Sequence, residues 1–249
     1  CASGAAGRYG NTLSSDADCT GPCSAGYYCP ERSGSNIALE CGGAYVYCPE
    51  GSSIPLTVPA GKKSTGGMEA TRTGYEDCVA GYYCTGGVQT QCEPGEYSET
   101  GAEACLPCPP GTYSDGSFLA VSDVCQGQCN AGSFCRGGSS SVTGEPCPAG
   151  QYCEAGTTEP MPCQAGYYCP QGSSTATQNV CADGEWSGEG SSSCSACPDG
   201  TYSSTPAEKV SATSCASCAA GRYGNTLSSD ANCTGPCSAG YYCPERSGS

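Results

Sequence analysis

Cysteine is the residue that most constrains this chain, because it occupies 26 of the 249 positions. Leu, Ile, Val and Phe taken together are fewer than the cysteines, too few for a hydrophobic core of the usual size. Disulfide bonds must therefore substitute for a core, since closing a loop of about 15 residues removes roughly 3 kcal/mol of unfolded-state freedom. Such bonds persist in oxidising compartments, so we expect an extracellular protein.

Nearly every cysteine belongs to one of two short motifs. The first motif, Cys-x-x-Gly-x-aromatic-Ser, begins at Cys92, Cys108, Cys181, Cys197 and, in variant form, Cys218. The second motif, Cys-x-x-Gly-Tyr-Tyr-Cys, begins at Cys23, Cys78, Cys163 and Cys237, with variants at Cys41, Cys129 and Cys147. In both motifs the glycine supplies the positive φ that a tight turn needs, and the aromatic ring that follows covers a neighbouring disulfide.

The motifs predict how the cysteines pair, although crossed connectivities stay open at this point. A further cysteine follows each first motif, which predicts the bonds Cys92–Cys105, Cys108–Cys125, Cys181–Cys194, Cys197–Cys215 and Cys218–Cys233. Each second motif is expected to close on itself, which predicts Cys23–Cys29, Cys41–Cys48, Cys78–Cys84, Cys129–Cys135, Cys147–Cys153, Cys163–Cys169 and Cys237–Cys243. This scheme leaves Cys1 and Cys19 unassigned.

A long cysteine-free stretch supports the scheme. Val58 begins the sequence VPAGKKS, which imitates the first motif with valine in the cysteine position. The cysteine expected near Gly74 or Tyr75 is missing as well. The joint absence of both partners is what paired cysteines predict.

Residues 215–249 repeat residues 1–35 with 33 identical positions out of 35. A single-domain enzyme has no use for a second copy of its opening segment, whereas a tandem array or an end-to-end polymer does. The repeat therefore predicts one period of a larger assembly, which runs from Cys1 to Ser214 and begins again at Cys215. Because Gly4 stands where the second copy has Cys218, we expect Cys19 to be a free thiol or residue 4 to be cysteine in the true sequence. We prefer cysteine at residue 4, since an odd thiol is rarely the resting state in a secreted protein.

No segment carries an apolar period of 3.6 residues over helical length. The expected fold class is one of small disulfide-rich modules, made of short β-ribbons and turns with almost no helix and strung into an elongated rod. We expect a cysteine-rich module over residues 1–35 and modules with a cysteine-poor stretch at 51–77 within residues 36–91. Further cysteine-rich modules are expected over residues 92–180 and 181–249.

Several runs resemble known cysteine-rich repeats. CPPGTYSDGS at Cys108, CPAGQYCEAGTT at Cys147 and CQAGYYCPQGSSTAT at Cys163 are similar to ephrin-receptor-like and tumour-necrosis-factor-receptor-like repeats. With VPAGKKSTGG at Val58, they also resemble repeat arrays of protist surface proteins, including the hair proteins (mastigonemes) of flagella. The resemblance covers almost the whole chain and implies disulfide-ribbon modules, which serve as receptor stalks, ligand-binding ectodomains and structural fibres alike.

Composition argues against several function classes. The net charge of −15 and the scattered acidic residues disfavour nucleic acid as a partner. The sequence contains no apolar run of 18 residues, so we expect no membrane insertion in this segment. The chain has no histidine, which removes the commonest general base and most catalytic metal sites. We therefore expect no enzymatic activity and no cofactor.

One set of cysteines has an alternative interpretation. Cys194, Cys197, Cys215 and Cys218 have the spacing of a four-cysteine zinc site, and the pairs Cys105/Cys108 and Cys215/Cys218 have the spacing of redox motifs. The disulfide scheme accounts for the same residues, and an oxidising compartment would consume the thiols. We prefer the disulfides.

Four kinds of contact site are expected outside the cysteines. The adjacent pair Lys62 and Lys63 is a candidate for docking on an acidic surface of a neighbouring period, with an exposed hinge as the alternative. The second ring of each tyrosine pair is a candidate for lateral packing, namely Tyr28, Tyr83, Tyr168 and Tyr242. Asn232 opens the sequence Asn-Cys-Thr and is a glycosylation candidate. Serine clusters are further candidates for carrying glycans.

These expectations converge on an extracellular structural protein, a repeat unit of a disulfide-stapled fibre or cell-surface filament that assembles with itself. The alternative is a receptor or adhesive ectodomain that binds a protein ligand through one exposed module. The near-identical copy that begins at Cys215 suits a lattice better, because every period of a lattice must offer the same contacts.

Overall fold

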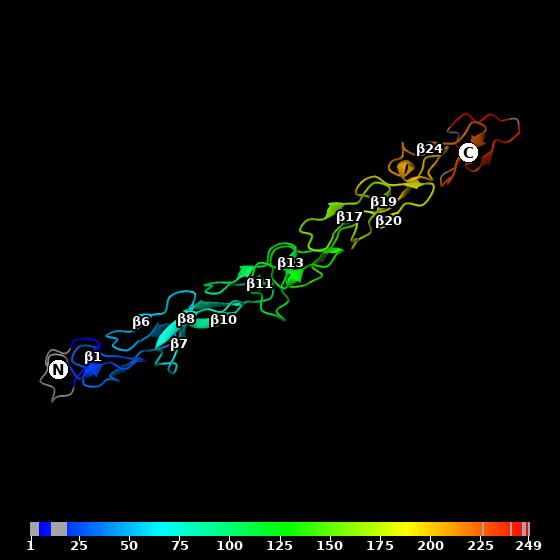
Figure 1. The fold of residues 1–249 in the computed structure, drawn as a ribbon. Coiled ribbons are helices and arrows are strands. Elements are labelled where there is room, and N and C mark those ends of the chain that lie inside the picture. Colours follow the sequence, from blue (N-terminus) through cyan, green and yellow to red (C-terminus); the bar gives the residue numbers. More distant parts are fainter. Residues whose placement is uncertain (1–4, 11–18, 226, 240, 246–247, 249) are drawn as a thin grey trace. The chain divides into compact units, whose positions relative to one another are not determined.

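A computed structural model describes residues 5–10, 19–225, 227–239, 241–245 and 248 (Figure 1). These residues form 13 two-stranded antiparallel sheets and a single turn of 3-10 helix, η1 (Pro206–Glu208). The predicted fold class of small disulfide-rich modules with short β-ribbons and almost no helix is confirmed. Contacts divide the chain into two compact units, unit 1 with Cys1–Cys108 and Ser114–Gln126, and unit 2 with Pro109–Tyr113 and Gly127–Ser249.

Most strands are only two residues long. Unit 1 contains β1 (Arg8–Tyr9), β2 (Gly21–Pro22), β3 (Tyr27–Tyr28), β4 (Leu39–Glu40), β5 (Val46–Tyr47), β6 (Leu56–Thr57), β7 (Lys62–Thr65), β8 (Gly74–Asp77), β9 (Tyr82–Thr85), β10 (Val88–Gln91), β11 (Glu96–Tyr97) and β12 (Leu106–Pro107). Unit 2 contains β13 (Thr112–Tyr113), β14 (Gly127–Gln128), β15 (Ser133–Phe134), β16 (Glu145–Pro146), β17 (Gln151–Tyr152), β18 (Met161–Pro162), β19 (Tyr167–Tyr168), β20 (Asn179–Val180), β21 (Glu185–Trp186), β22 (Ser195–Ala196), β23 (Thr201–Tyr202), β24 (Ala216–Ser217), β25 (Arg222–Tyr223) and β26 (Gly235–Pro236).

Each ribbon follows from the motif that opens it. In most ribbons the motif glycine turns the chain, the two residues after it form one strand, and the two residues before the next motif form the other. In the ribbon of β19 and β20, for example, Tyr167 pairs with Val180 and Tyr168 with Asn179. Gly166 in this turn has a φ of +86°, a conformation that residues with a Cβ adopt only at a cost.

Disulfide sulfur forms most of the buried interior. The described bonds are the twelve that the two motifs predict, from Cys23–Cys29 to Cys237–Cys243, with Cα atoms 5.7 to 6.2 Å apart. Val46, Val58, Ala120 and Phe134 are the buried apolar side chains other than cysteine among the described residues. Cross-links thus occupy the place that apolar side chains fill in an ordinary domain.

The structure excludes one of the two alternatives for Cys19. Cys19 is disulfide-bonded, so the free-thiol alternative is wrong. Residues 1 and 4, on which the rest of that prediction depends, lie outside the described residues.

A repeated pair of backbone hydrogen bonds joins each module to the next. At Gly150 the amide nitrogen donates to the carbonyl oxygen of Cys169 (2.7 Å), and the carbonyl oxygen accepts from the amide of Cys163 (3.0 Å). The same pair recurs at Gly7, Gly26, Gly61, Gly81, Gly95, Gly111, Gly132, Gly166, Gly184, Gly200 and Gly221. We name this arrangement the glycine joint.

A second glycine reaches back across the joint. The amide of Gly190 donates to the carbonyl of Cys163 (2.9 Å), and its own carbonyl oxygen occupies the space that a Cβ at Gly150 would need. The same approach recurs for Gly7 with Gly51, Gly61 with Gly101, Gly111 with Gly156, and Gly132 with Gly172. The motif glycine is therefore required both by its positive φ and by a neighbouring backbone.

Unit 1 holds the two longest ribbons, one in the stretch where the sequence lacks cysteine and one directly after it. β7 pairs with β8 over four residues, and β9 pairs with β10 around the turn at Gly86 and Gly87. The two ribbons lie side by side through β7, and the amide of Ser64 donates to the carbonyl of Gly87 (3.0 Å) (Figure 1). A longer ladder and an additional lateral contact thus stabilise this cysteine-poor stretch.

Unit 2 holds a buried lysine next to η1. Lys209 is only 7% exposed, and its Nζ donates to the carbonyl oxygen of Cys181 (2.9 Å) and to Oδ1 of Asp183 (2.8 Å). A buried ammonium requires such partners, because an unpaired buried charge is costly. Lys209 therefore links η1 to the ribbon that begins at Cys181.

We expect Lys209→Met to lower the free energy of unfolding by about 1–3 kcal/mol, because the methionine fills the space but leaves the Cys181 carbonyl without its donor. Guanidinium unfolding under oxidising conditions measures the change. Lys63→Met is the control, since Lys63 belongs to a more exposed ion pair and should cost less than about 1 kcal/mol. Equal losses in the two variants would contradict a special role for Lys209.

Candidate assembly surfaces

The predicted docking pair of lysines is neutralised within its own ribbon. β7 and β8 place Lys62 opposite Asp77 and Lys63 opposite Glu76, and both pairs form salt bridges, with 3.1 Å between Lys63 Nζ and Glu76 Oε1. The Tyr75 ring lies 6.0 Å from the ammonium of Lys62. Lys62 and Lys63 therefore have acidic partners in their own ribbon, since the only adjacent acidic pair of the sequence faces them, and docking of the two lysines on a neighbouring period stays a prediction.

These ion pairs occur in the module that lacks a first-motif disulfide. In the ribbon of β11 and β12, Glu96 pairs with Pro107, four residues after Cys92 and two after Cys105. In the ribbon of β7 and β8, Lys62 pairs with Asp77, four residues after Val58 and two after Tyr75. Val58 and Tyr75 thus stand in the two cysteine positions. Val58 is buried, and Tyr75 packs edge-on against Tyr47 with 4.9 Å between ring centroids.

The double variant Val58→Cys/Tyr75→Cys is expected to form the missing disulfide and to raise the free energy of unfolding by at most about 3 kcal/mol. Intact mass before and after alkylation detects the bond, and guanidinium unfolding measures the stability. Each single variant is a control that lacks the bond, and Tyr75→Cys also reports the loss of the contact with Tyr47. Two free thiols in the folded double variant would show that the two positions are not equivalent to a cysteine pair.

The tyrosine pairs differ in their surroundings. Tyr28, Tyr83 and Tyr168 are half-buried, whereas Tyr242 is 86% exposed. Tyr28 packs against the cluster of Cys41, Val46 and Cys48, so its ring covers the disulfide of the following module. The ring of Tyr28 is therefore partly covered by its own chain, and lateral packing by the second ring stays a prediction at Tyr28, Tyr83, Tyr168 and Tyr242.

The most apolar exposed segment of unit 1 was not predicted from the sequence. It is the loop of residues 115–124, closed by the bond between Cys108 and Cys125. Its exposed apolar side chains are Phe118 (73%), Val124 (64%), Val121 (51%) and Leu119 (41%). We name it the apolar loop. A concentration of exposed apolar side chains marks a contact surface more often than a scatter of single residues does.

The apolar loop is held in shape at both ends. The amide and the hydroxyl of Ser117 donate to the carboxylate of Asp115 (2.8 and 2.6 Å), which lowers the pKa of Asp115. The amide of Asp115 donates to Oε1 of Gln126 (2.9 Å), and the carbonyl of the buried Ala120 accepts from the amide of Ser98 (3.2 Å). The apolar side chains are therefore presented by a constrained loop.

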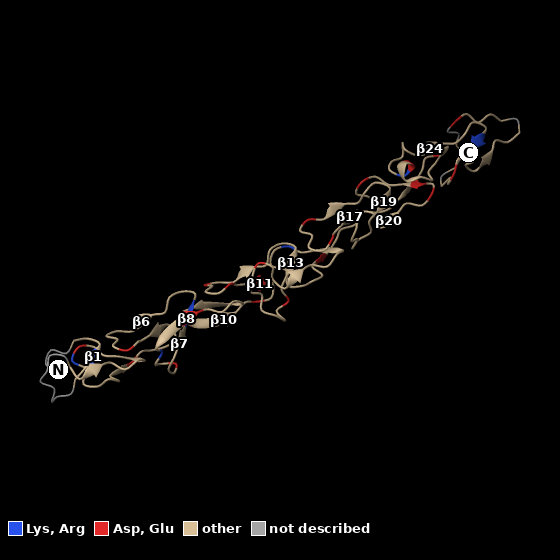
Figure 2. Ribbon diagram, viewed as in Figure 1, with Lys and Arg blue, Asp and Glu red and all other residues tan. Residues whose placement is uncertain are grey.

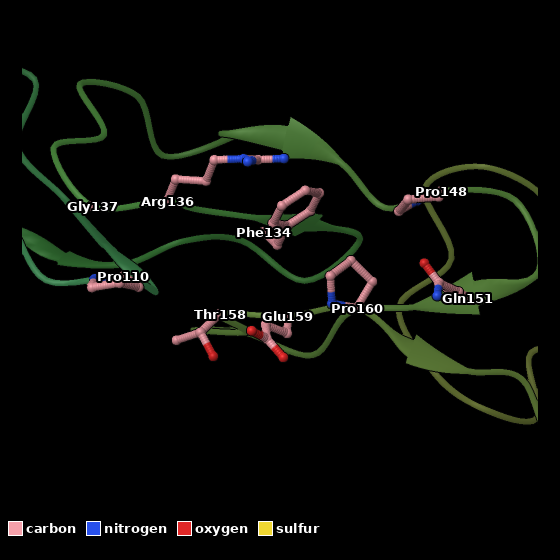
Figure 3. Close-up of a pocket in the computed structure, with 9 residues that line it drawn as sticks. All are labelled: Pro110, Phe134, Arg136, Gly137, Pro148, Gln151, Thr158, Glu159 and Pro160. Atoms are coloured by element: carbon pink, nitrogen blue, oxygen red, sulfur yellow. The ribbon is translucent and has the colours of Figure 1, made fainter.

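An open groove of about 730 Å³ lies in unit 2 (Figure 3). Figure 3 shows the Phe134 ring with the Arg136 side chain on one side and Pro160 on the other. The Arg136 guanidinium carbon lies 5.7 Å from the ring centroid, and Arg136 Nε lies 2.9 Å from Glu145 Oε1. Pro110, Gly137, Pro148, Gln151, Thr158 and Glu159 complete the lining. The groove offers an apolar floor with one neutralised cation.

Charge is spread thinly over both units. Figure 2 shows Asp and Glu on turns of either unit, with few Lys and Arg among them. Four ion pairs occur among the described residues, formed by Lys62, Lys63, Arg136 and Lys209. Such a distribution favours solubility and spacing between neighbouring molecules over recognition of one highly charged partner.

The glycosylation candidate is accessible. Asn232 is exposed in the loop closed by Cys218 and Cys233. The hydroxyl of Thr234, the third residue of the acceptor sequence, donates to Oδ1 of Asn225 (2.6 Å). A glycan at Asn232 stays a prediction.

The cysteines whose spacing matches a zinc site all form disulfide bonds. Cys194, Cys197, Cys215 and Cys218 all lie in disulfides, so the alternative of a four-cysteine zinc site is not supported. Cys92, Glu96 and Cys105 lie close together, but the two sulfurs are bonded to each other. Oxidised sulfur does not offer the thiolate that a metal binds.

The fold and its cross-links define a class: a protein of small cysteine-rich modules, each a β-ribbon stapled by disulfides, of the kind found in secreted or extracellular proteins. Comparison with protein families and with curated proteins gives no match for this sequence. In the part of the chain that the structure describes, no helix has the length and apolar character needed to cross a membrane.

Proposed function

We propose that this chain is an extracellular structural protein, a repeat unit of a disulfide-stapled fibre or cell-surface filament of the flagellar-hair type, with itself as its principal partner. It acts through assembly and not through catalysis. Glycans on its exposed turns and at Asn232 are part of the proposal. They would keep neighbouring fibres apart.

The observation that carries this proposal is the glycine joint. Twelve motif glycines among the described residues make the same two backbone hydrogen bonds to the following module. A joint made of backbone atoms works with any side chains, so it can be repeated as often as the motif is. An array that grows by one rule supports a structural role.

The two copies of the repeated segment, residues 1–35 and 215–249, have the same ribbon register and the same glycine joint. Arg8 pairs with Pro22 in the first copy, and Arg222 pairs with Pro236 in the second. The described bonds at Gly7 and Gly221 also correspond, because their donors and acceptors occupy equivalent positions of the two copies. The same ribbon register and the same joint in both copies support a lattice in which every period offers the same contacts.

The second candidate is a receptor or adhesive ectodomain, and the apolar loop favours it. Four exposed apolar side chains within residues 115–124 are a feature that one module has and that an evenly repeated spacer does not need. In the proposed filament the same loop is a lateral contact between fibres.

Electron micrographs of the purified, non-reduced protein separate the two candidates. Regular long filaments are the expected result for the structural protein, and dispersed single molecules would contradict it. The double variant Phe118→Ser/Val124→Ser removes the most exposed apolar side chains of the apolar loop. We expect it to keep filaments and to lose their lateral bundling, whereas Val79→Ser, at another exposed valine, should change neither.

A further inference from the structure

The two copies of the second motif in the repeated segment have the same sequence and different surroundings. Tyr27 and Tyr28 are half-buried, and the cysteines that flank them, Cys23 and Cys29, are fully buried. Tyr241 and Tyr242, at the corresponding positions, are 80% and 86% exposed. Because the side chains are identical, a neighbouring segment must cause the difference.

In the first copy that neighbour is residues 36–52. Tyr27 pairs with Glu40 and Tyr28 with Leu39, which forms the ribbon of β3 and β4. The Tyr28 ring packs on the cluster that contains the bond between Cys41 and Cys48. The tyrosine pair is therefore covered by the module that follows it.

Hydrogen bonds fix the position of this segment. The amide of Ser24 donates to the carbonyl of Asn36 (2.8 Å), and the Asn36 side-chain amide donates back to the Ser24 hydroxyl (2.8 Å). Further along, the amide of Cys29 donates to the carbonyl of Ser52 (2.9 Å). Residues 36–52 thus supply acceptors at both ends of the motif.

The surroundings of Gly7 also show the presence of residues 36–52. A Cβ at Gly7 would overlap the carbonyl oxygen of Gly51, which belongs to residues 36–52. A Cβ at Gly221, the corresponding glycine of the second copy, would meet no atom within 4 Å, although its φ of +82° matches the +86° of Gly7. The space that Gly51 fills in the first copy is open in the second.

The second copy has the same joint as the first copy, but its tyrosine pair is not covered by a following segment. The amide of Gly221 donates to the carbonyl of Cys243 (3.0 Å), and the amide of Cys237 donates to the carbonyl of Gly221 (3.0 Å). Among the described residues, the amides of Ser238 and Cys243 find no acceptor, whereas those of Ser24 and Cys29 do. An open groove of about 470 Å³ remains, lined by Tyr223, Cys237, Ser238, Tyr241, Tyr242, Cys243 and Gly248.

We propose that this groove, the acceptor groove, binds a second copy of residues 36–52 contributed by a following period joined to this one. The occupant supplies carbonyl oxygens to the amides of Ser238 and Cys243, a two-residue strand to Tyr241 and Tyr242, and a disulfide for the Tyr242 ring to cover. An intact separate chain keeps its own residues 36–52 on its own first copy, so the covalently continuous period is the source. This inference rests on the proposed array and identifies how one period meets the next.

The experiment appends a second copy of residues 36–52 after Ser249. Hydrogen exchange of the Ser238 and Cys243 amides should slow by at least about tenfold, towards the rates of Ser24 and Cys29 in the same molecule. Peptides of the two copies are distinguished by mass when they include Asn232 or Asp18. A chain extended by the same residues in scrambled order, with the cysteine positions kept, is the control and should show no slowing.

A second readout uses the glycine. Gly221→Ala should open the second copy more in the extended chain than in the chain of 249 residues, because only the extended chain brings a carbonyl oxygen to that position. The absence of free thiols shows that the appended cysteines have paired. Exchange at the rate of the scrambled control would overturn the acceptor groove. If filaments form although exchange is not slowed, the proposed array holds but its periods meet through another contact. Failure of the acceptor groove can therefore be distinguished from failure of the proposed function.

Discussion

Full reduction and alkylation of the cysteines is expected to abolish the native structure. The buried side chains of this protein are mostly disulfide cysteines, and the described bonds close loops with sequence separations of 6 to 18 residues. Each such loop contributes about 2–3 kcal/mol by restricting the unfolded chain, so the sum exceeds the net stability of an ordinary domain. Circular dichroism and resistance to protease measure the loss.

The control is the same alkylation without reductant, which should leave spectrum and protease resistance unchanged because the described cysteines are disulfide-bonded. Stepwise reduction should release single modules, since each bond joins residues of one module. A native circular dichroism spectrum after complete reduction would refute the replacement of a hydrophobic core by cross-links.

Gly150→Ala is expected to open a glycine joint and to cost about 2–5 kcal/mol, the sum of a left-handed alanine and the loss of both hydrogen bonds of the joint. Its Cβ would overlap the backbone carbonyl of Gly190, so the following module must move. Guanidinium unfolding gives the total change. Hydrogen exchange at the amides of Cys163 and Gly150 locates it.

Gly221→Ala is a matched control for this variant. Gly221 has nearly the same φ as Gly150, +82° against +85°, and a Cβ there would meet no atom within 4 Å. It should therefore cost only the about 1–2 kcal/mol of an alanine in the left-handed region. If the two variants lose the same stability, the approach of the second glycine contributes nothing and the cost is conformational alone.

The pairing of the cysteines could be predicted from the sequence because it is local. A bond such as Cys163–Cys169 spans one turn, and the glycine between the two cysteines fixes that turn. The bond between Cys108 and Cys125 spans a longer loop, but the following motif leaves no other cysteine unassigned nearby. The ribbons follow from the same motifs, whereas the arrangement of the modules into a rod stays a prediction.

The ion pairs of the cysteine-poor stretch were not predicted, because the sequence alone did not give the register in which β7 pairs with β8. Lys62 and Lys63 and the acidic pair Glu76 and Asp77 are both visible in the sequence, but nothing local says that they face each other. The sequence did contain a usable signal, because Tyr75 occupies the position where a first-motif module has its second cysteine. Aligning Tyr75 with that cysteine implies that Lys62 pairs with Asp77. The sequence analysis therefore considered the lysines without the acidic partners that the ribbon gives them.

The apolar loop and Lys209 depend on long-range neighbours. Phe118 and Val124 lie between two cysteines like the polar residues of the other loops, and their exposure follows from the anchoring of the loop by Ala120 and Asp115. Lys209 is buried because the carbonyl of Cys181, from the preceding ribbon, meets its ammonium. Neither contact has a sequence pattern of its own.

The glycine joint makes the connection between modules independent of the length of the loops that the modules carry. The loops closed by first-motif disulfides differ in length, with separations of 13 residues at Cys181, 17 at Cys108 and 18 at Cys197. The joints at Gly111, Gly184 and Gly200 nevertheless make the same two backbone bonds. Insertions and deletions in the loops can therefore accumulate without changing how modules connect, so the surface of such a chain can diversify while its connectivity stays constant.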